Sequence, residues 1–330
     1  MRLIFSPSSA VRSLLAAVSA GVLAAAMGGC GGSGGGSADT ITIAYQPGIG
    51  YAPLLIAKQQ RLLEKKFPKK KIAWRILNSG AAIRDGMISK DVQVGAGGIG
   101  PFIVGFGNGL PWKIVMSLNE ANLFLMSKSY GSLPEIKGKG KIAMPGPDSI
   151  QAVVLRKAAK DRLGDAKTLD SQIVSMGHPD GLQALTSGQV AGHLTSPPFQ
   201  EQEQKGGAHP IVKSYDVFGE HTFNSVFVLN DFYKSNPDFM KAMQAAVESS
   251  AKMLESNPNQ AAQVLSQETG GKVPAAQMKE QITAGDITYS TKPMGFMAFA
   301  KFMKEIGLIK KIPDSASGYF FANEFTKGGS

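Results

Sequence analysis

The sequence predicts an α/β fold built from two α/β lobes, and three observations lead to this prediction. Apolar runs rich in β-branched residues alternate with helix-like patterns, which favours parallel sheets with crossover helices. Turns rich in glycine, proline and serine follow several of the expected strands, and the alternation restarts in mid-chain. The chain after its N-terminal segment, roughly 290 residues, exceeds what one small core needs, so two lobes are expected.

The first lobe begins with a repeated strand and helix pattern. Its expected elements are strand 41–45, helix 53–65, strand 72–77, a short helix containing Ile83, Met87 and Ile88, strand 92–96 and the glycine loop 97–100. Pro101 then opens a further helix, because proline is tolerated in the first helical turn. This order of elements builds one sheet.

Strands at 113–117 and 123–127 follow, and the pattern then restarts. The second lobe is expected to contain strand 142–144, turn 145–148, helix 149–163, strand 172–176, helix 179–187 and strand 190–194. After a further strand at 223–229 everything is expected to be helical, with helices at 236–254, 259–267, 275–283 and 294–306. These helices have no sheet of their own and must pack on a lobe already formed.

The N-terminal segment, residues 1–29, carries Arg2 and Arg12, then an apolar run and small residues up to Cys30. A charged start, an apolar centre and a small-residue cleavage site are typical of a signal peptide. The apolar run is short for a membrane-spanning helix, which needs about 20 apolar residues. The segment resembles a bacterial lipoprotein signal, and this resemblance implies that Cys30 carries a lipid after cleavage.

Residues 31–38 read GGSGGGSA, a composition that forms a flexible tether because it buries no apolar surface. We therefore expect an anchor and tether over 30–38 and a fold that begins near Asp39. Cys30 is the single cysteine of the sequence, so no intramolecular disulfide can form.

The charge of the chain is basic without a nucleic-acid motif. Loss of residues 1–29 leaves 33 basic and 25 acidic residues, a net charge of +8. Much of the excess lies in the lysine runs at 65–71 and 137–141, at turns before expected strands, where solvated lysines are ordinary. We expect no nucleic-acid partner.

Five groups of motifs in register resemble one protein family. They are Ile43-Ala44-Tyr45 with Tyr51-Ala52-Pro53, the loop 97–101 (GGIGP), the stretch 136–143 (IKGKGKIA), the stretch 181–190 (GLQALTSGQV) and Pro237-Asp238-Phe239. In this order they are similar to the substrate-binding proteins of ABC importers in the nitrate, sulfonate, taurine and thiamine-precursor group.

This resemblance implies a type II periplasmic binding protein fold with two hinge crossings between the lobes. Lobe I would comprise 39–122 and 224–330, and lobe II 123–223. The resemblance further implies a monomer in the periplasm, anchored to the cell envelope membrane, which delivers a small solute to a permease and ATPase complex. Closure of two lobes around a ligand is an established way to bury a small solute.

The expected ligand contacts lie in loops after strand ends, because such loops form the crevice of an open α/β sheet. The candidate ligand-binding residues are Tyr45, Gln46, Tyr51, Ser79, Gly80, Gly98, Ile99, Asn119, Asp148, Ser149, His178, Thr195, Ser196, Phe223 and Asn224. Phe199 is a further candidate for the wall. Fixed cations near these loops are few, chiefly Arg84 and His178, so a singly charged anion fits better than a phosphate.

Enzyme patterns in the sequence are weak. Residues 95–100 spell a dinucleotide-binding fingerprint and Glu120 lies 20 residues on, but Glu120 follows the next expected strand in a lobe connection. The four histidines lack zinc-site spacing. The thiamine-pyrimidine synthases, which resemble these binding proteins, carry a cysteine-rich iron motif, and here the lone cysteine precedes the tether. We expect no cofactor, no metal and no catalytic residue.

The sequence thus predicts a binding lipoprotein for a small anionic or polar organic solute such as a sulfonate, taurine or nitrate. An alternative within the same fold is a receptor for a neutral pyrimidine or aromatic thiamine precursor. A thiamine-pyrimidine synthase-like enzyme is the less favoured alternative.

Replacing the lone cysteine tests the anchor. Cys30→Ala should release the protein from the membrane fraction into the soluble envelope fraction without loss of ligand binding, because anchor and ligand site are expected to be separate. Fractionation and immunoblotting measure the release, and Ser33→Ala in the tether is the matched control. Retention of the Cys30→Ala protein in the membrane fraction would contradict lipid attachment at this residue.

Overall fold

The computed structural model describes residues 40–330. The expected signal peptide, Cys30 and the glycine-serine tether lie outside the described residues. Within residues 40–330, no helix combines the length and the apolar character needed to cross a membrane.

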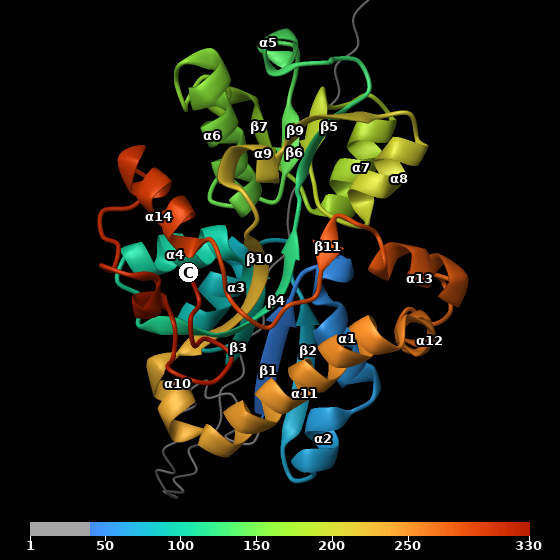
Figure 1. Ribbon diagram of the computed structural model, residues 1–330, viewed down its shortest axis with the longest axis vertical. Helices are drawn as coiled ribbons and strands as arrows, with labels where there is room; N and C mark the ends of the chain where they lie inside the picture. Colours follow the sequence, from blue (N-terminus) through green and yellow to red (C-terminus); the bar gives the residue numbers. More distant parts are fainter. Residues whose placement is uncertain (1–39) are drawn as a thin grey trace, which may run out of the picture. The chain divides into compact units, whose positions relative to one another are not determined.

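Strands and helices alternate along most of the described chain (Figure 1). The strands are β1 (Thr40–Tyr45), β2 (Lys71–Ile76), β3 (Val94–Gly98), β4 (Trp112–Ala121), β5 (Phe124–Ser127), β6 (Ile142–Met144), β7 (Ile173–Ser175), β8 (Gly192–Leu194), β9 (His209–Lys213), β10 (Thr222–Leu229) and β11 (Ile287–Thr288).

The helices up to β10 are η1 (Ile49–Tyr51), α1 (Ala52–Gln59), α2 (Leu62–Lys66), α3 (Gly80–Ile88), α4 (Ile99–Gly107), α5 (Leu133–Ile136), α6 (Ile150–Leu163), η2 (Asp170–Gln172), α7 (His178–Thr186), α8 (Phe199–Lys205) and α9 (Ser214–Phe218). Those after it are α10 (Asn230–Ser235), α11 (Pro237–Ser256), α12 (Pro258–Glu268), α13 (Ala275–Ile282), α14 (Phe296–Glu305) and η3 (Ala316–Tyr319).

The strands form two sheets with the same internal order. The six-stranded sheet runs β11-β4-β10-β3-β1-β2, and the five-stranded sheet runs β7-β6-β8-β5-β9. In each sheet the first of three parallel strands lies in the middle, as β1 does between β2 and β3 and β6 does between β7 and β8. The next strand, β10 or β5, is antiparallel to its neighbours. The prediction of two α/β units is confirmed.

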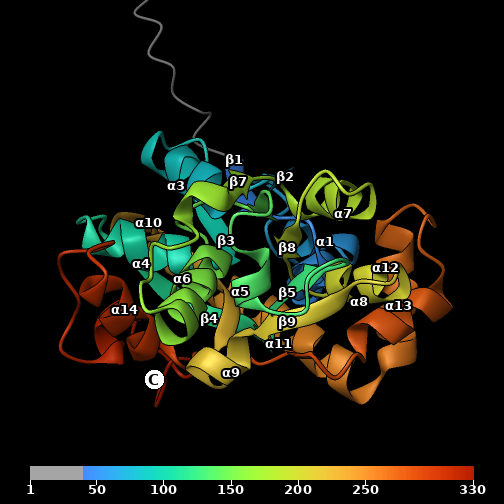
Figure 2. The ribbon, with the colours of Figure 1, turned by 90° about the horizontal axis from the view of Figure 1, so that it is seen from above.

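Helices cover both faces of the six-stranded sheet. Alternate residues of β1 point to opposite faces, because side chains alternate along a strand. Ile41, Ile43 and Tyr45 pack with α1, α2 and α11 on one face, whereas Ala44 packs on the other with α3 and α4. Figure 2 shows the strands between α3, α4 and α14 on one side and α1, α11 and α12 on the other.

An aromatic cluster forms the core on the α4 face. The Phe102 ring stacks on Trp112 with centroids 5.3 Å apart and contacts Phe227 at 5.7 Å and Phe296 at 6.3 Å. All four side chains are buried. Gly105 permits this packing, because a Cβ there would lie 2.2 Å from the Trp112 ring.

The chain passes between the two sheets twice. Asn122 and Leu123 join β4 to β5, and residues 214–221 join β9 to β10. Helix α14 adds a further contact: the Phe299 ring stacks on Phe218 of α9 with centroids 3.9 Å apart, and Glu305 pairs with Lys160 of α6. The elements beside the six-stranded sheet are therefore held to those beside the five-stranded sheet on the α14 side.

Several elements differ from those expected from the sequence, among them the short helices α5, α8 and α9, which were not expected. The helix expected at 53–65 is divided into α1 and α2, because Arg61 between them adopts a left-handed backbone with φ of 55°. Strand β9 was not expected, and the segment after β10 is not wholly helical. The two-residue strand β11 pairs with the end of β4, too short a contact to leave a periodic pattern.

Truncation of the central ring tests the aromatic cluster. Phe102→Ala should lower the free energy of unfolding by about 3–5 kcal/mol, because it opens a cavity among rings that cannot collapse onto one another. Ile88 is 55 % exposed, so Ile88→Ala should change the free energy of unfolding by about 0.5 kcal/mol or less. Urea denaturation measures both, and equal effects would contradict a rigid cluster.

Candidate ligand-binding site

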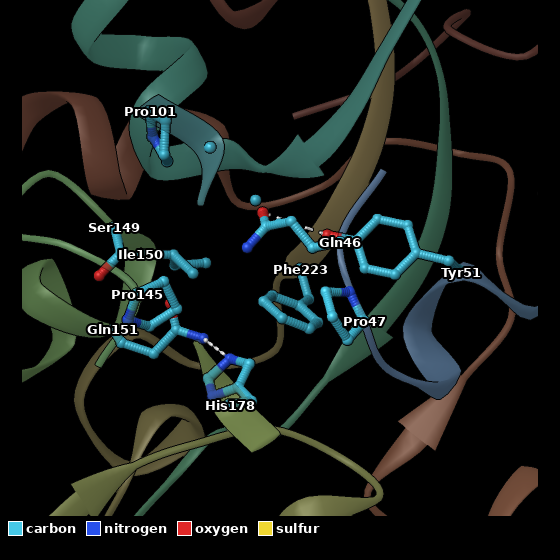
Figure 3. Close-up of a pocket in the computed structure, with 12 residues that line it drawn as sticks. Gln46, Pro47, Tyr51, Pro101, Pro145, Ser149, Ile150, Gln151, His178 and Phe223 are labelled. Carbon is cyan, nitrogen blue, oxygen red and sulfur yellow. Dashed lines mark hydrogen bonds between the residues drawn. The ribbon is translucent and has the colours of Figure 1, made fainter. Parts of the chain in front are cut away.

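A cavity of about 20 Å³ lies where the carboxyl ends of strands from both sheets meet. Its lining residues come from both sides (Figure 3): Gln46, Pro47, Tyr51, Gly80, Gly98, Pro101, Pro145, Ser149, Ile150, Gln151, His178 and Phe223. This edge, at the reversal of strand order, is where ligands bind in open α/β sheets.

Four helices begin at this cavity. Helices α3 and α4 contribute Gly80 and Gly98 at their N-termini, and α6 and α7 contribute Ser149 and His178. The first backbone N–H groups of a helix have no acceptor within the helix, and the helix dipole is positive at this end. Two positive helix ends from each sheet therefore point at the same small space.

The sequence explains why these four helices begin here. The hydroxyls of Ser79 and Ser149 accept hydrogen bonds from the N–H groups of Ala82 and Ala152, both at 3.1 Å. Helices α4 and α7 instead have Gly98 and Gly177 as N-caps, with no side-chain cap. Glycine caps leave more N–H groups open to a bound anion.

One uncharged side chain of the wall, Gln46, also places a hydrogen-bond donor in the cavity (Figure 3). The hydroxyl of Tyr51 donates to Oδ1 of Asn224 at 3.0 Å and lies 3.4 Å from Oε1 of Gln46. This fixes the Gln46 amide with its nitrogen directed into the cavity (Figure 3). Burial raises the pKa of Tyr51, so the phenol stays protonated. No lysine or arginine is among the cavity-lining residues of the described chain.

His178 is the titratable imidazole of the wall. Its Nε2 lies 3.1 Å from Nε2 of Gln151, its Nδ1 lies 3.1 Å from Nε2 of His193, and its ring stacks on Phe199. Burial first, and His193 second, lower the pKa of His178 well below its usual value, so the ring is neutral in this state. The anion-attracting groups of this state are thus dipoles rather than charges.

The two halves of the site touch across the cavity. A Cβ at Gly100 of α4 would lie 2.5 Å from the backbone nitrogen of Ile150 and 2.9 Å from the carbonyl oxygen of Asp148. Nearby, Nη1 of Arg84 donates to Oδ2 of Asp148 at 2.6 Å. The structure is therefore closed, and its cavity holds about one water. Entry of any organic solute requires the halves to separate.

Seven of the fifteen candidate residues line the cavity: Gln46, Tyr51, Gly80, Gly98, Ser149, His178 and Phe223. The other eight do not: Tyr45, Ser79, Ile99, Asn119, Asp148, Thr195, Ser196 and Asn224. Ser79 caps α3 at the cavity edge, and Asp148 pairs with Arg84 beside it. Ile99 is fully buried in the core, and the Tyr45 hydroxyl accepts from Lys58 on the α1 side.

Two buried asparagines support the wall from behind. Asn119 donates to the carbonyl oxygen of Gly50, and Asn224 accepts from Tyr51. Both hold the η1 turn that carries Tyr51. Thr195 and Ser196 are buried in the loop after β8, where the carbonyl oxygen of Ser196 accepts from the N–H of Phe199 and starts α8. Ligand contact by these four residues stays a prediction.

Five lining residues were absent from the candidates: Pro47, Pro101, Pro145, Ile150 and Gln151. Pro47, Ile150 and Gln151 fall within segments 46–51 and 147–151, which the sequence predicts to border the crevice, and their proximity to named candidates was the available signal. Pro101 and Pro145 gave no such signal, because proline is common in turns and at helix starts. The hydrogen bond between Gln151 and His178 joins two helices and leaves no pattern in the sequence.

Residues 34–267 match the NMT1-like family. The chain belongs to this family. The taurine-binding periplasmic protein of Escherichia coli (strain K12) is 24 % identical to this NMT1-like protein over 223 residues, which cover 66 % of this chain and 68 % of that protein.

Solved structures of periplasmic binding proteins share the fold of this NMT1-like protein. The nitrate-binding protein NrtA from Synechocystis PCC 6803 superposes with a TM-score of 0.69 and 16 % identity, over 85 % of this chain and 84 % of that chain. The alkanesulfonate-binding protein SsuA from Xanthomonas axonopodis pv. citri, bound to MOPS, gives 0.66 and 18 %, over 84 % and 96 %. The predicted periplasmic binding protein fold and family are confirmed.

A methyl group at the closest backbone approach tests the closed state. Gly100→Ala should weaken ligand binding about tenfold or more, because its Cβ cannot coexist with the Ile150 backbone nitrogen 2.5 Å away. The ligand-free protein can open and should keep its melting temperature. Gly285→Ala, whose Cβ meets nothing within 4 Å, is the matched control. Calorimetric titration measures both, and unaltered affinity in Gly100→Ala would contradict closure at this contact.

Proposed function

We propose that this NMT1-like protein is the substrate-binding protein of an ABC importer and captures a small anionic or polar organic solute of the sulfonate, taurine or nitrate class. The observation that carries this proposal is the convergence of four helix N-termini on one cavity, two from each sheet. Family membership supports it, as do the printed names of the taurine-, alkanesulfonate- and nitrate-binding relatives.

Electrostatics favour an anion of low charge. Each helix N-terminus stabilises a nearby negative charge by about 0.3–1 kcal/mol when exposed and up to about 2 kcal/mol when partly buried. These contributions suit a nitrate or sulfonate, whose charge is spread over three oxygens. A phosphate dianion would need a cluster of cations, and the described cavity wall contains no lysine or arginine.

Closure of two lobes provides the binding mechanism in this proposal. Lobe I, residues 39–122 and 224–330, moves against lobe II, residues 123–223, about the crossings at β4–β5 and β9–β10. Helices α3 and α4 belong to lobe I and α6 and α7 to lobe II, so an anion gains all four helix termini only in the closed state. A ligand that interacts more strongly with one state shifts the population toward it.

The transport role assigns partners and a place to the protein. A monomer held at the envelope membrane by lipid on Cys30, on the periplasmic side, would present its closed form to a permease and ATPase complex. The glycine-serine tether over 31–38 would allow the folded part to reach that complex. The role assigns no cofactor and no catalysis, in keeping with relatives that are named as binding proteins.

A ligand panel tests the function. Mature protein purified without its signal segment should be stabilised by taurine, methanesulfonate or nitrate, because binding to the native state raises the free energy of unfolding. At a ligand concentration of 100 times Kd this gain is about 2.7 kcal/mol, equivalent to a rise of about 5–10 °C in melting temperature. Differential scanning fluorimetry in Tris, a cationic buffer, measures the shift.

The panel includes the alternative ligands and a charge control. A hydroxymethylpyrimidine represents the neutral thiamine precursors, and choline represents a cation of similar size. Stabilisation by the pyrimidine alone would replace the anion assignment by the alternative receptor. Absence of a shift with every anion would contradict the proposed function.

A further inference from the structure

A chain of four buried polar side chains runs from the cavity into the elements beside the five-stranded sheet. Gln151 on α6 contacts Nε2 of His178 at 3.1 Å, and Nδ1 of His178 contacts Nε2 of His193 on β8 at 3.1 Å. Nδ1 of His193 then contacts Oε1 of Glu203 on α8 at 2.5 Å. Each residue in this relay, as we call the four side chains, is at most 5 % exposed.

The packing around the relay is built to hold it. Gly181 of α7 faces the imidazole of His193, where a Cβ would lie 2.5 Å from Nε2. Phe199 stacks on His178 with ring centroids 5.5 Å apart. Removal of a carboxyl group and two imidazoles from water is costly, and apolar side chains would fill this space more cheaply. The dipole-based anion site described above does not require His193 or Glu203.

The charge state of the relay is neutral in the closed structure. Burial raises the pKa of Glu203 to about 8 and lowers the pKa of His193 to about 3. At neutral pH the carboxyl group therefore carries a proton and both imidazoles are uncharged. In an imidazole pair, the hydrogen bond made by one nitrogen fixes the proton on the other.

The unpaired oxygen of Glu203 sets the direction of the hydrogen bonds. Oε2 of Glu203 is buried without a hydrogen-bond partner among the described residues, so the acid proton is best satisfied on Oε1, donating to Nδ1 of His193. Nε2–H of His193 then donates to Nδ1 of His178. The Gln151 side chain makes no other hydrogen bond among the described residues, so its amide group can rotate by 180° and exchange its nitrogen for its oxygen. In that orientation Nε2–H of His178 donates to the Gln151 amide oxygen.

We propose that the relay supplies a positive charge to the cavity only when an anion is bound. The bound anion draws the proton of Glu203 through His193 to His178, which becomes an imidazolium. This rests on the proposed function and identifies which groups tune that site for charge. The anion accepts the Nε2–H of His178 beside or in place of Gln151. His193 and Glu203 are positioning residues, because they act on the ligand through His178.

The proton transfers balance without solvent. The Oε1–H bond of Glu203 breaks and an N–H bond forms at Nδ1 of His193. The Nε2–H bond of His193 breaks and an N–H bond forms at Nδ1 of His178. His193 ends neutral as its other tautomer, Glu203 ends as a carboxylate, and His178 ends as an imidazolium with two N–H bonds. The cation lies against the anion, and the site is neutral again when the ligand leaves.

No other charged group in the described surroundings replaces this cation. On α7, α8, β6, β8 and β5 the remaining charged groups are Asp180, Glu201 and Lys205. On α6 the buried Arg156 pairs with Asp170. The other charged residues of α6 are Lys157, Lys160, Asp161 and Arg162. Arg84 beside the cavity is already paired with Asp148. Among the groups of these elements, the proton of Glu203 is therefore the one that can give His178 a positive charge.

The relay predicts a defined pH dependence. Below the Glu203 pKa of about 8, binding moves a proton within the protein and exchanges none with solvent, so affinity stays flat. Above it, ligand-free Glu203 loses the proton whereas the complex retains it on His178. Affinity for methanesulfonate or nitrate then falls as pH rises, approaching tenfold per pH unit.

Three calorimetric titrations with methanesulfonate and nitrate, between about pH 6 and pH 9.5 in Tris-type cationic buffers, test the relay. Wild type should follow the profile above. Glu203→Gln, which keeps a hydrogen-bond partner for His193 but supplies no acid proton, should bind about tenfold more weakly or worse near pH 7 and lose the fall above pH 8, because a neutral donor replaces a charge-assisted one. Glu255→Gln, at an exposed position of α11 outside the relay, is the matched control and should bind like wild type.

Nitrogen NMR of wild type with labelled histidine provides a readout that needs no variant. Saturation with either anion should move both ring nitrogens of His178 into the imidazolium range while His193 changes tautomer and stays neutral. A neutral His178 in the complex, or full affinity with an unchanged pH profile in Glu203→Gln, overturns the relay but leaves the anion receptor standing. If methanesulfonate, nitrate and taurine all fail to bind wild type, the proposed function fails and the relay with it.

Discussion

The close approach of two helix N-termini governs this structure. The backbone of α4 at Gly100 lies against the backbone of residues 148–150, where α6 begins, with no room for one extra methyl group. Each terminus alone is an ordinary, weak electrostatic feature of a helix. Brought together with the N-termini of α3 and α7, they direct four positive helix ends at one cavity, whose lining in the described residues contains no lysine or arginine.

The repeated order of the strands makes this approach possible. In each sheet a central first strand lies between the second and third, so the helices that follow those strands begin at one edge. The chain crosses between the sheets through short segments at β4–β5 and β9–β10, which turns these two edges toward each other. Packing of α14 against α6 and α9 holds the other side together. Solute entry is thus confined to separation at the cavity.

Much of the candidate site was predictable because local rules place functional loops after strands. Ser79 and Ser149 indicate where two helices begin, because serine is favoured at the N-cap of a helix. Gly98 falls at the end of a glycine-rich strand. The roles of Asn119 and Asn224 were not accessible in this way. Both are polar residues at strand ends, and only packing decides that they support the η1 turn instead of lining the cavity.

The sequence by itself determined the α/β alternation, many of the turns and helix starts, and the similarity to a family of binding proteins, because propensity, capping and periodicity act over a few neighbouring residues. Tertiary structure alone decided which termini meet and which side chains share protons. Gln151, His178, His193 and Glu203 lie on four separate elements, so no spacing in the sequence records their contact. Hydrogen bonding and burial across the fold create the relay, and these depend on where the chain brings distant residues together.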